Sequence, residues 1–412
     1  MTKQGPRDVR MRGFDRRATV EQALAWLDAA VGELGAEHVS LDAAAGRILA
    51  ETVNSPVDVP GFDRAMMDGF AVIAADTHGA SIYNRLTLRV VGEVLPGRTF
   101  EGPVKSGQAV RIMTGAPVPE GTDAVLPAEQ VDIDGVSVHV VDPVPQRKHI
   151  GPQGEDLRAG DRLLVRGRRL RPQDVGLLSS VGRGEVAVVR RPMVRIVVTG
   201  DELLPRGTAP QGSRIVDANG PMLEALVARD GGVVINPGIV PDTPEAIAAA
   251  MAEPVDVILV SGGSSVGQED HAPGLLATLG ELAIHGVAMR PSSPAGMGRI
   301  GDRLVFLLPG NPVSCLCAYD FFAGRAIRGR GGRDPSWPYR SRVLPLRRKL
   351  VSAVGRVDYA RVVILDGGVE PIAVSGASLL SSTTQADGFV IVAADSEGFG
   401  PGETVDVMCY DR

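Results

Sequence analysis

The spacing of apolar and polar residues divides the chain into stretches of different texture. From position 19 to position 34, leucine and valine recur at helical spacing behind Thr19 and Gln22, which together form a capping box. This pattern predicts a helix with one apolar face. Residues 56–150 instead carry short β-rich pieces separated by Gly, Pro and Asp, which is typical of a compact antiparallel β-rich domain.

Between residues 151 and 190 the chain returns to loops, a short strand and a helix. We expect this part to pack with residues 18–55 and to form a discontinuous helical/linker domain. Residues 1–17 are polar and rich in Arg, and we expect them to be a disordered lead-in.

Residues 191–335 show the clearest pattern, in which apolar runs such as VRIVV, VDVILV and RLVFLL alternate with helical segments. Strands that are apolar at nearly every position indicate a parallel sheet covered by helices on both faces. The sequence therefore predicts a doubly wound parallel α/β domain. Residues 336–412 carry only short strand-like pieces at turn-rich spacing, which indicates a C-terminal β-barrel. The predicted fold class is multidomain α/β plus β.

Composition narrows the class of protein. The 412 residues are 44% apolar and 22% charged, as in globular proteins, and the net charge of −6 argues against a sequence-independent nucleic-acid binder. No apolar run reaches the ~20 residues that span a bilayer, and no signal-peptide core is present, so we expect a cytoplasmic protein without membrane contact. Among the three cysteines, Cys315 and Cys317 have no nearby His, which favours reduced thiols over a zinc site.

Polar residues gather where the predicted parallel strands end. The first strand leads into Asp201 and Glu202, Asp217 and Asn219 precede the next helix, and Asp270 follows the third strand. Ligands bind at the carboxyl ends of such strands, where loop amides and helix N-termini converge. Carboxylates on one rim repel one another, and a hard cation such as Mg²⁺ relieves that repulsion. We therefore expect a metal-assisted anion site with Glu202, Asp217 and Asp270 as metal ligands; the alternative for Asp217 or Asn219 is a helix cap.

A glycine-rich stretch, SGGSSVGQEDH, occupies residues 261–271 at the end of the third strand. Its glycines let the backbone approach a phosphate closely, and its serines add hydroxyl donors. The candidate binding residues here are Gly262, Gly263, Ser264, Ser265 and Gly267. The stretch is not a Walker A loop, because no Lys follows the last glycine, and the alternative is a turn needed only for packing. The loop after the last strand of this domain adds Pro309, Gly310, Asn311 and Ser314.

Seven motifs occur in order along residues 18–412, and they read FDRAMMDGFAV, RIMTGAPVPEGTDAV, GED, VTGDEL, IVDANG, SGGSSVGQED and LPGNPVS. Together they resemble the molybdopterin molybdotransferases, a family that includes the C-terminal domain of gephyrin. The resemblance implies four domains and insertion of molybdate into adenylylated molybdopterin with release of AMP, aided by Mg²⁺ or a similar divalent cation. It also implies an elongated homodimer, in which the α/β domain faces the partner's β-rich domain, and contact with other molybdenum-cofactor biosynthesis proteins.

The resemblance gives roles to residues that the sequence alone does not single out. Asp68 and Thr114 each precede a glycine at a turn, which by itself favours a structural role. Matched to the motifs of the family, six residues fall on functional positions: Asp68, Thr114, Asp156, Glu202, Asp217 and Asp270. Attack on a phosphoanhydride requires neutralised phosphate charge and a stabilised oxyanion, which cation-binding carboxylates and loop amides provide.

Residues 286–294 depart from the family pattern. Where the family pattern resembles K-x-x-x-K-P-G-K-P, this chain has Gly286, Arg290 and Ser293 at the lysine positions. Arg290 keeps one charge as a planar fork, so either Arg290, His285 and the serines rebuild an anion site, or Arg290 is a salt-bridge partner. Two alternative functions follow: a degenerate paralogue or scaffold that binds molybdopterin without efficient turnover, and a nucleotide pyrophosphate hydrolase on the same α/β domain.

Overall fold

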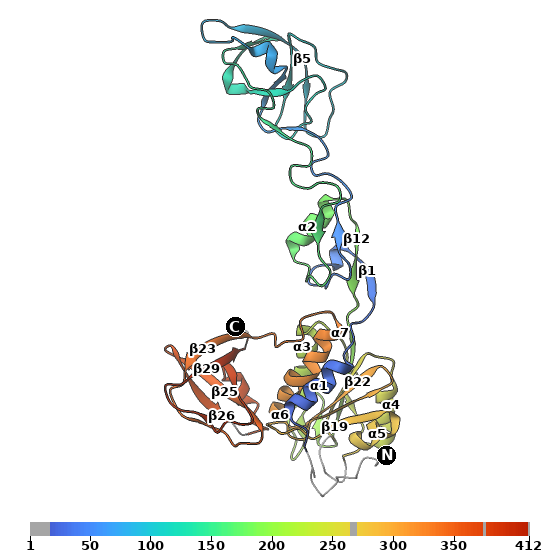
Figure 1. Ribbon diagram of the computed structural model, residues 1–412. Coiled ribbons are helices and arrows are strands. Elements are labelled where there is room, and N and C mark those ends of the chain that lie inside the picture. The colour runs from blue at the N-terminus through green and yellow to red at the C-terminus, as the bar shows by residue number, and fades with distance from the viewer. Residues whose placement is uncertain (1–16, 264–269, 374–375, 411–412) are drawn as a thin grey trace. The chain divides into compact units, whose positions relative to one another are not determined.

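The computed structural model describes residues 17–263, 270–373 and 376–410, and it divides into two compact units. One unit takes the described residues up to Glu37 together with those from Val189 onward, and the other takes His38–Val188. Figure 1 shows the elements of both units. No helix in the described part of the chain is long and apolar enough to cross a membrane.

The β-rich part of the second unit is a six-stranded sheet with a core on each face. Phe70 and Ala71, neighbours on one strand, belong to opposite cores. The sheet order is β7 (Ala124–Pro127), β4 (Gly69–Val72), β6 (Gln108–Ile112), β5 (Leu86–Val94), β9 (Ser137–Val140) and β8 (Val131–Asp134). The pairs are antiparallel except β5 with β6, which differs from the antiparallel prediction. Residues 95–107 form the crossover that a parallel pair requires.

The rest of this unit joins two distant parts of the sequence in one core. Leu49, Leu170 and Leu178 are fully buried there. Val186 and Val188, at the C-terminal end of this unit, are buried in the same core. The elements around this core are η1 (Leu41–Ala43), α2 (Pro172–Ser180) and the strand pairs β1 (Ala36–Ser40) with β12 (Glu185–Val189) and β2 (Val53–Asn54) with β11 (Arg162–Leu164). A further pair, β3 (Arg64–Ala65) with β10 (Ile150–Gly151), belongs to the core of the β-rich sheet that holds Ala71. The domain boundaries given above stay a prediction.

The α/β domain is built on a seven-stranded sheet. The parallel strands are β16 (Val233–Ile235), β17 (Ile239–Val240), β13 (Met193–Thr199), β18 (Val257–Ser261) and β22 (Arg303–Leu308). One edge differs from the prediction, because β21 (Gly296–Ile300) and β19 (Glu281–His285) are antiparallel. Only two residues connect β21 to β22, and so short a connection joins antiparallel neighbours only.

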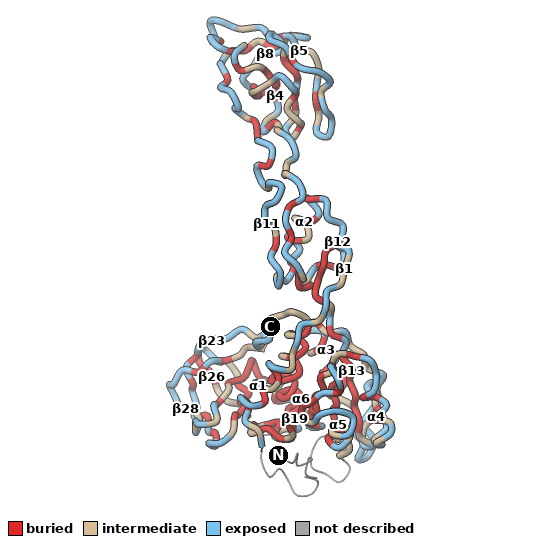
Figure 2. The backbone as a smooth tube through the Cα atoms, turned by 45° about the vertical axis from the view of Figure 1, so that its right-hand side comes forward, coloured by how far each residue is buried: buried red, intermediate tan, exposed pale blue. Residues whose placement is uncertain are grey.

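Helices cover both faces of this sheet. Leu259 of β18 packs beneath α3 (Asn219–Arg229) and α6 (Pro312–Ala318), whereas its neighbour Ile258 packs beneath α4 (Pro244–Ala252) and α5 (Ala272–Leu279). A π-helical turn, Tyr319–Ala323, joins α6 to α7 (Gly324–Arg330). Figure 2 shows strand β13 of this sheet as almost entirely buried. Helix α1 (Val20–Ala30) buries Ala23 and Leu27 in the core that lies between this sheet and helices α3 and α6. It therefore packs on the α/β domain rather than with the linker residues.

The C-terminal part has a six-stranded sheet around its own core. Its order is β20 (Met289–Arg290), β25 (Val357–Leu365), β27 (Gly388–Val392), β29 (Thr404–Cys409) and β23 (Arg340–Pro345), with β26 (Gly368–Ala373) also beside β25. β20 precedes β21 in the sequence yet pairs with β25. The chain therefore contributes a strand to the C-terminal sheet before the last strands of the α/β domain are formed. Closure of this sheet into a barrel stays a prediction.

Candidate functional site

A cavity of about 560 Å³ opens where the parallel strands β13, β18 and β22 end. We call it the carboxylate cavity, because four acidic side chains line it: Glu202, Asp217, Asp242 and Asp270. The described residues that line it include no Lys or Arg. Three of the four acids were predicted from their positions at strand ends, and the structure brings those three to one cavity.

Asn219, the first residue of α3, connects three loops of this cavity. Its buried Nδ2 donates to Ser261 Oγ at 2.9 Å and to the carbonyl of Gly310 at 2.8 Å. These partners end β18 and follow β22, so a single amide ties both loops to α3. The neighbouring Asp217 accepts a hydrogen bond from the N–H of Gly220 at 2.9 Å. Asp217 therefore caps the helix and also lines the cavity.

Gly262 of the glycine loop passes too close to its neighbour for any side chain. Gly262 has a φ of +105°, and a Cβ at this position would lie 2.1 Å from the carbonyl oxygen of Thr199. A Cβ on Gly200 would lie 2.7 Å from the carboxylate of Glu202. Gly263 lines the same cavity with a φ of +55°. The predicted residues Ser264, Ser265 and Gly267 lie outside the described residues.

Asp242 is a cavity residue that the sequence reasoning missed. It follows β17 and accepts a hydrogen bond from Thr199 Oγ1 at 2.8 Å. Applying the strand-end rule to every parallel strand would have found it. Within the described residues, no three His, Cys, Asp or Glu side chains are grouped closely enough to hold a metal ion. The predicted metal-ligand set thus shares a cavity without forming a ready coordination site.

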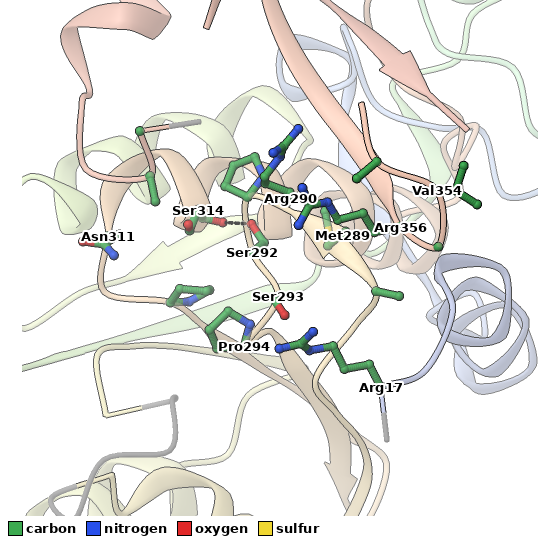
Figure 3. Close-up of a pocket in the computed structure, with 17 residues that line it drawn as sticks. Arg17, Met289, Arg290, Ser292, Ser293, Pro294, Asn311, Ser314, Val354 and Arg356 are labelled. Atoms are coloured by element: carbon green, nitrogen blue, oxygen red, sulfur yellow. Dashed lines mark hydrogen bonds between the residues drawn. The ribbon is translucent and has the colours of Figure 1, made fainter. Parts of the chain in front are cut away.

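A second cavity, of about 630 Å³, shares Pro294, Pro309 and Asn311 with the first. We call it the arginine pocket, because the charged side chains among its described lining residues are Arg17, Arg290 and Arg356. Figure 3 shows these arginines lining the pocket from different parts of the chain. The predicted residue Ser314 also lines this pocket.

Arg290 pairs with Asp358, a fully buried carboxylate. Its Nε donates to Asp358 Oδ1 at 3.1 Å, and its terminal nitrogen donates to the other oxygen. Arg356 Nε lies 3.4 Å from the same carboxylate, and Ser352 Oγ donates to it at 2.7 Å. Arg290 is therefore a salt-bridge partner that also lines the pocket. His285, on β19, is not among the described lining residues.

A loop from the C-terminal part lies against the start of α6. The N–H of Val313 donates to the carbonyl of Ala377 at 2.9 Å. Ala377 lines the arginine pocket, and Ser378 lines the carboxylate cavity. Ser292 Oγ donates to the carbonyl of Ser314 from the other side. Both cavities are thus built jointly by the α/β domain and the C-terminal part.

In the other unit, Asp68 and Thr114 contact each other. The Asp68 carboxylate accepts hydrogen bonds from both Oγ1 and N–H of Thr114, each at 2.7 Å. These bonds lower the pKa of the exposed Asp68 carboxyl and keep it ionised. Asp156 lies exposed in the loop after β10, and its N–H donates to the carbonyl of Val59 at 3.0 Å. No hydrogen bond of the described residues joins Asp156 to the other two.

Known families match most of the chain. Residues 18–182 match the "MoeA N-terminal region (domain I and II)", residues 195–328 the "Probable molybdopterin binding domain", and residues 343–410 the "MoeA C-terminal region (domain IV)". The chain is also 34% identical over 390 residues to the "Molybdopterin molybdenumtransferase" of Haemophilus influenzae, covering 91% of this chain and 94% of that relative. The chain belongs to the MoeA family of molybdopterin molybdenumtransferases.

Other MoeA relatives agree over the same length. A molybdopterin molybdenumtransferase of Staphylococcus aureus is 29% identical, covering 90% of each chain. Two crystal structures of the MoeA protein of Pyrococcus horikoshii match at 32% and 31% identity, with TM-scores of 0.85 and 0.74. Each covers 96% of this chain and 100% of the solved chain. The family predicted from the seven motifs is confirmed, as is a multidomain α/β fold with β-rich N- and C-terminal regions.

Proposed function

We propose that this MoeA-family chain inserts molybdate into adenylylated molybdopterin and releases AMP. The observation that supports the proposal is a pair of adjoining cavities of opposite charge. Four acids line one cavity and three arginines line the other, and both include Pro309 and Asn311. A free oxyanion and a nucleotide whose phosphates travel with a cation make opposite electrostatic demands, and two such cavities meet both.

The arginine pocket is the proposed molybdate subsite. Guanidinium groups attract oxyanions by their charge and donate N–H hydrogen bonds to them, and Arg290 and Arg356 line this pocket. Ser293 Oγ is buried and has no hydrogen-bond partner among the described residues. An oxyanion that entered the pocket would accept that hydrogen bond after rotation of the serine side chain. The pocket thus offers charge and a hydroxyl donor at positions where the family pattern has lysines.

The carboxylate cavity is the proposed site of the nucleotide portion. Its glycine loop brings the backbone of Gly262 and Gly263 to the cavity wall, where amides would stabilise negative charge as the phosphoanhydride breaks. Glu202, Asp217 and Asp270 carry the hard oxygen donors that Mg²⁺ prefers. The described residues do not group three such ligands around one point. Titration of the protein with Mg²⁺, with and without AMP, tests its binding.

The homodimer implied by the family resemblance gives Asp68, Thr114 and Asp156 a role. We propose that these residues serve the carboxylate cavity of the partner subunit. The Asp68 carboxylate is suited to contact a cation or a donor group there, because it is exposed and is oriented by two hydrogen bonds from Thr114.

The proposed reaction is tested by incubating the protein with molybdate, Mg²⁺ and adenylylated molybdopterin and measuring AMP release. AMP above the level of an Asp270→Ala variant, together with active cofactor, is the expected result. Bound pterin without AMP release would indicate the scaffold alternative. Cleavage of common dinucleotides in the absence of pterin would indicate the hydrolase. Parallel reactions with tungstate identify which oxyanion is inserted.

A further inference from the structure

The N-terminal segment of the described chain lies beside the stretch that departs from the family pattern. Ala18 and Val287 form a parallel β-bridge. The N–H of Ala18 donates to the carbonyl of Gly286 at 3.0 Å, and the N–H of Ala288 donates to the carbonyl of Ala18 at 2.8 Å. These two bonds fix the backbone next to Arg17 against one wall of the arginine pocket.

Arg17 occupies this pocket from a part of the sequence that none of the motifs includes. It lines the same cavity as Arg290, Ser293 and Pro294. Figure 3 shows its side chain pointing toward Ser293 and Pro294. Two lysine positions of the family pattern, at Gly286 and Ser293, carry no charge in this chain. Ser293 lines the pocket together with Arg17, and Gly286 accepts a hydrogen bond from Ala18, the residue after Arg17.

The charged groups that line the pocket show what Arg17 adds to it. Arg290 and Arg356 both face the buried carboxylate of Asp358, which offsets one of their charges. Arg17 adds a third guanidinium group to the described lining of the pocket. Guanidinium groups bind the oxygens of a small dianion through charge-assisted hydrogen bonds. Without Arg17, the pocket would hold two arginines that share one acid.

We propose that Arg17, held in place by the Ala18–Val287 bridge, supplies the oxyanion-binding charge that Gly286 and Ser293 lack. The inference rests on the proposed molybdate subsite and names a binding residue of it. The guanidinium of Arg17 reaches the pocket from a backbone position outside residues 286–294. The pocket thus keeps a positive charge, but a different part of the sequence supplies it. The planar fork of Arg17 would bind two oxygens of one oxyanion.

Binding of sodium molybdate to the full chain tests the proposal by calorimetry at low ionic strength. Arg17→Ala is expected to weaken molybdate binding about tenfold, as for the loss of one charge-assisted contact. Arg17→Lys should retain most of the affinity. The double variant Arg17→Ala with Ser293→Lys should recover it, because Ser293 lines the same pocket. Added salt should weaken the wild type more steeply than Arg17→Ala.

Arg191→Ala is the matched control, because Arg191 is exposed in the same unit, lies outside the pocket and changes the net charge equally. Its molybdate affinity should equal that of the wild type, and AMP affinity should be unchanged in Arg17→Ala. Equal molybdate binding by Arg17→Ala and wild type would overturn the role of Arg17 while leaving the molybdate subsite intact. Absence of molybdate binding by the wild type would overturn the subsite itself and, with it, this role.

Discussion

Several residues of this chain have a structural role and also line a proposed functional site. Asp217 caps α3 and lines the carboxylate cavity, and Arg290 neutralises Asp358 while lining the arginine pocket. Substitution of either residue would confuse lost activity with lost stability. Thr114 offers a cleaner test, because one of its two hydrogen bonds to Asp68 comes from the backbone and survives a side-chain change.

The Thr114→Val variant should raise the pKa of Asp68 toward its ordinary value. The hydroxyl bond from Thr114 is the largest cause of the lowered pKa, and valine removes it while keeping the N–H bond. We expect AMP release to fall several-fold, whereas Thr114→Ser should behave like the wild type. A carboxyl-resolved NMR titration of both variants measures the pKa. An unchanged Asp68 pKa in Thr114→Val would contradict the assigned cause.

At the scale of elements, close backbone contacts fix the loops that follow the strands of the α/β sheet. The end of β18 turns through Gly262, where the backbone passes close to β13. A Cβ added to Gly274, inside α5, would meet no heavy atom within 4 Å, so this glycine is replaceable. The two glycines make a matched pair, since each substitution adds one methyl group within the same domain.

Gly262→Ala should abolish nucleotide binding in the carboxylate cavity. Its methyl group would overlap the carbonyl of Thr199, and its positive φ disfavours any side chain. Gly274→Ala should leave binding intact and stabilise the protein by about 0.5–1 kcal/mol, because alanine is the better helix former. AMP titration and thermal unfolding of both variants check the two expectations. Normal AMP affinity in Gly262→Ala would refute the need for glycine there.

Helix α2 provides a pH-dependent test at the same scale. Asp174 is buried and accepts hydrogen bonds from Arg168 at 2.8 and 3.0 Å and from the N–H of Arg171 at 2.9 Å. These partners, Arg168 foremost, hold its pKa well below the ordinary 3.8. Its contribution to stability is therefore complete above about pH 4 and is lost as pH falls toward the lowered pKa.

Asp174→Asn should lower the free energy of unfolding at pH 7 by about 2 kcal/mol, the usual value for lost charge-assisted hydrogen bonds. The difference between variant and wild type should shrink below pH 4, where the Asp174 carboxyl of the unfolded chain begins to protonate while the native carboxylate stays ionised. Urea unfolding followed by circular dichroism at pH 7 and at pH 3 measures both. A difference that stays constant between these pH values would rule out the ionised carboxylate as the cause.

Sequence reasoning succeeded where one local rule decides and failed where distant pairing decides. Glu202, Asp217 and Asp270 follow directly from the rule that parallel strands end on one edge. β20 has only two residues, and such a strand leaves no periodic signal, so its pairing with β25 could not be predicted. The position of Arg17 depends on the bridge between Ala18 and Val287, far apart in sequence, which no local pattern reveals.

At the scale of the whole molecule, the candidate residues are divided between two units. Glu202, Asp217 and Asp270 belong to one unit, and Asp68 and Thr114 belong to the other. If the second set serves the cavity of a partner subunit, each complete site requires residues from two chains. Two variants that are each inactive would then restore activity when they are mixed.

Mixing Asp68→Asn with Asp270→Asn tests this division. Each variant alone should release almost no AMP, whereas mixed dimers would contain one intact site out of two. After subunit exchange at equal concentrations, about half of the dimers are mixed, so we expect about a quarter of wild-type AMP release. A mixture no more active than the separate variants, with exchange verified by mass spectrometry, would place both residues in a site within one chain.

The bridge between Ala18 and Val287 also matters for how the protein is prepared. A purification handle fused ahead of Met1 would extend the segment that leads, through Arg17, to a bridge bordering the arginine pocket. A cationic or metal-chelating handle at that end would compete for the same small anions that the pocket is proposed to bind. Cloning with the handle at the opposite end of the chain avoids this artefact.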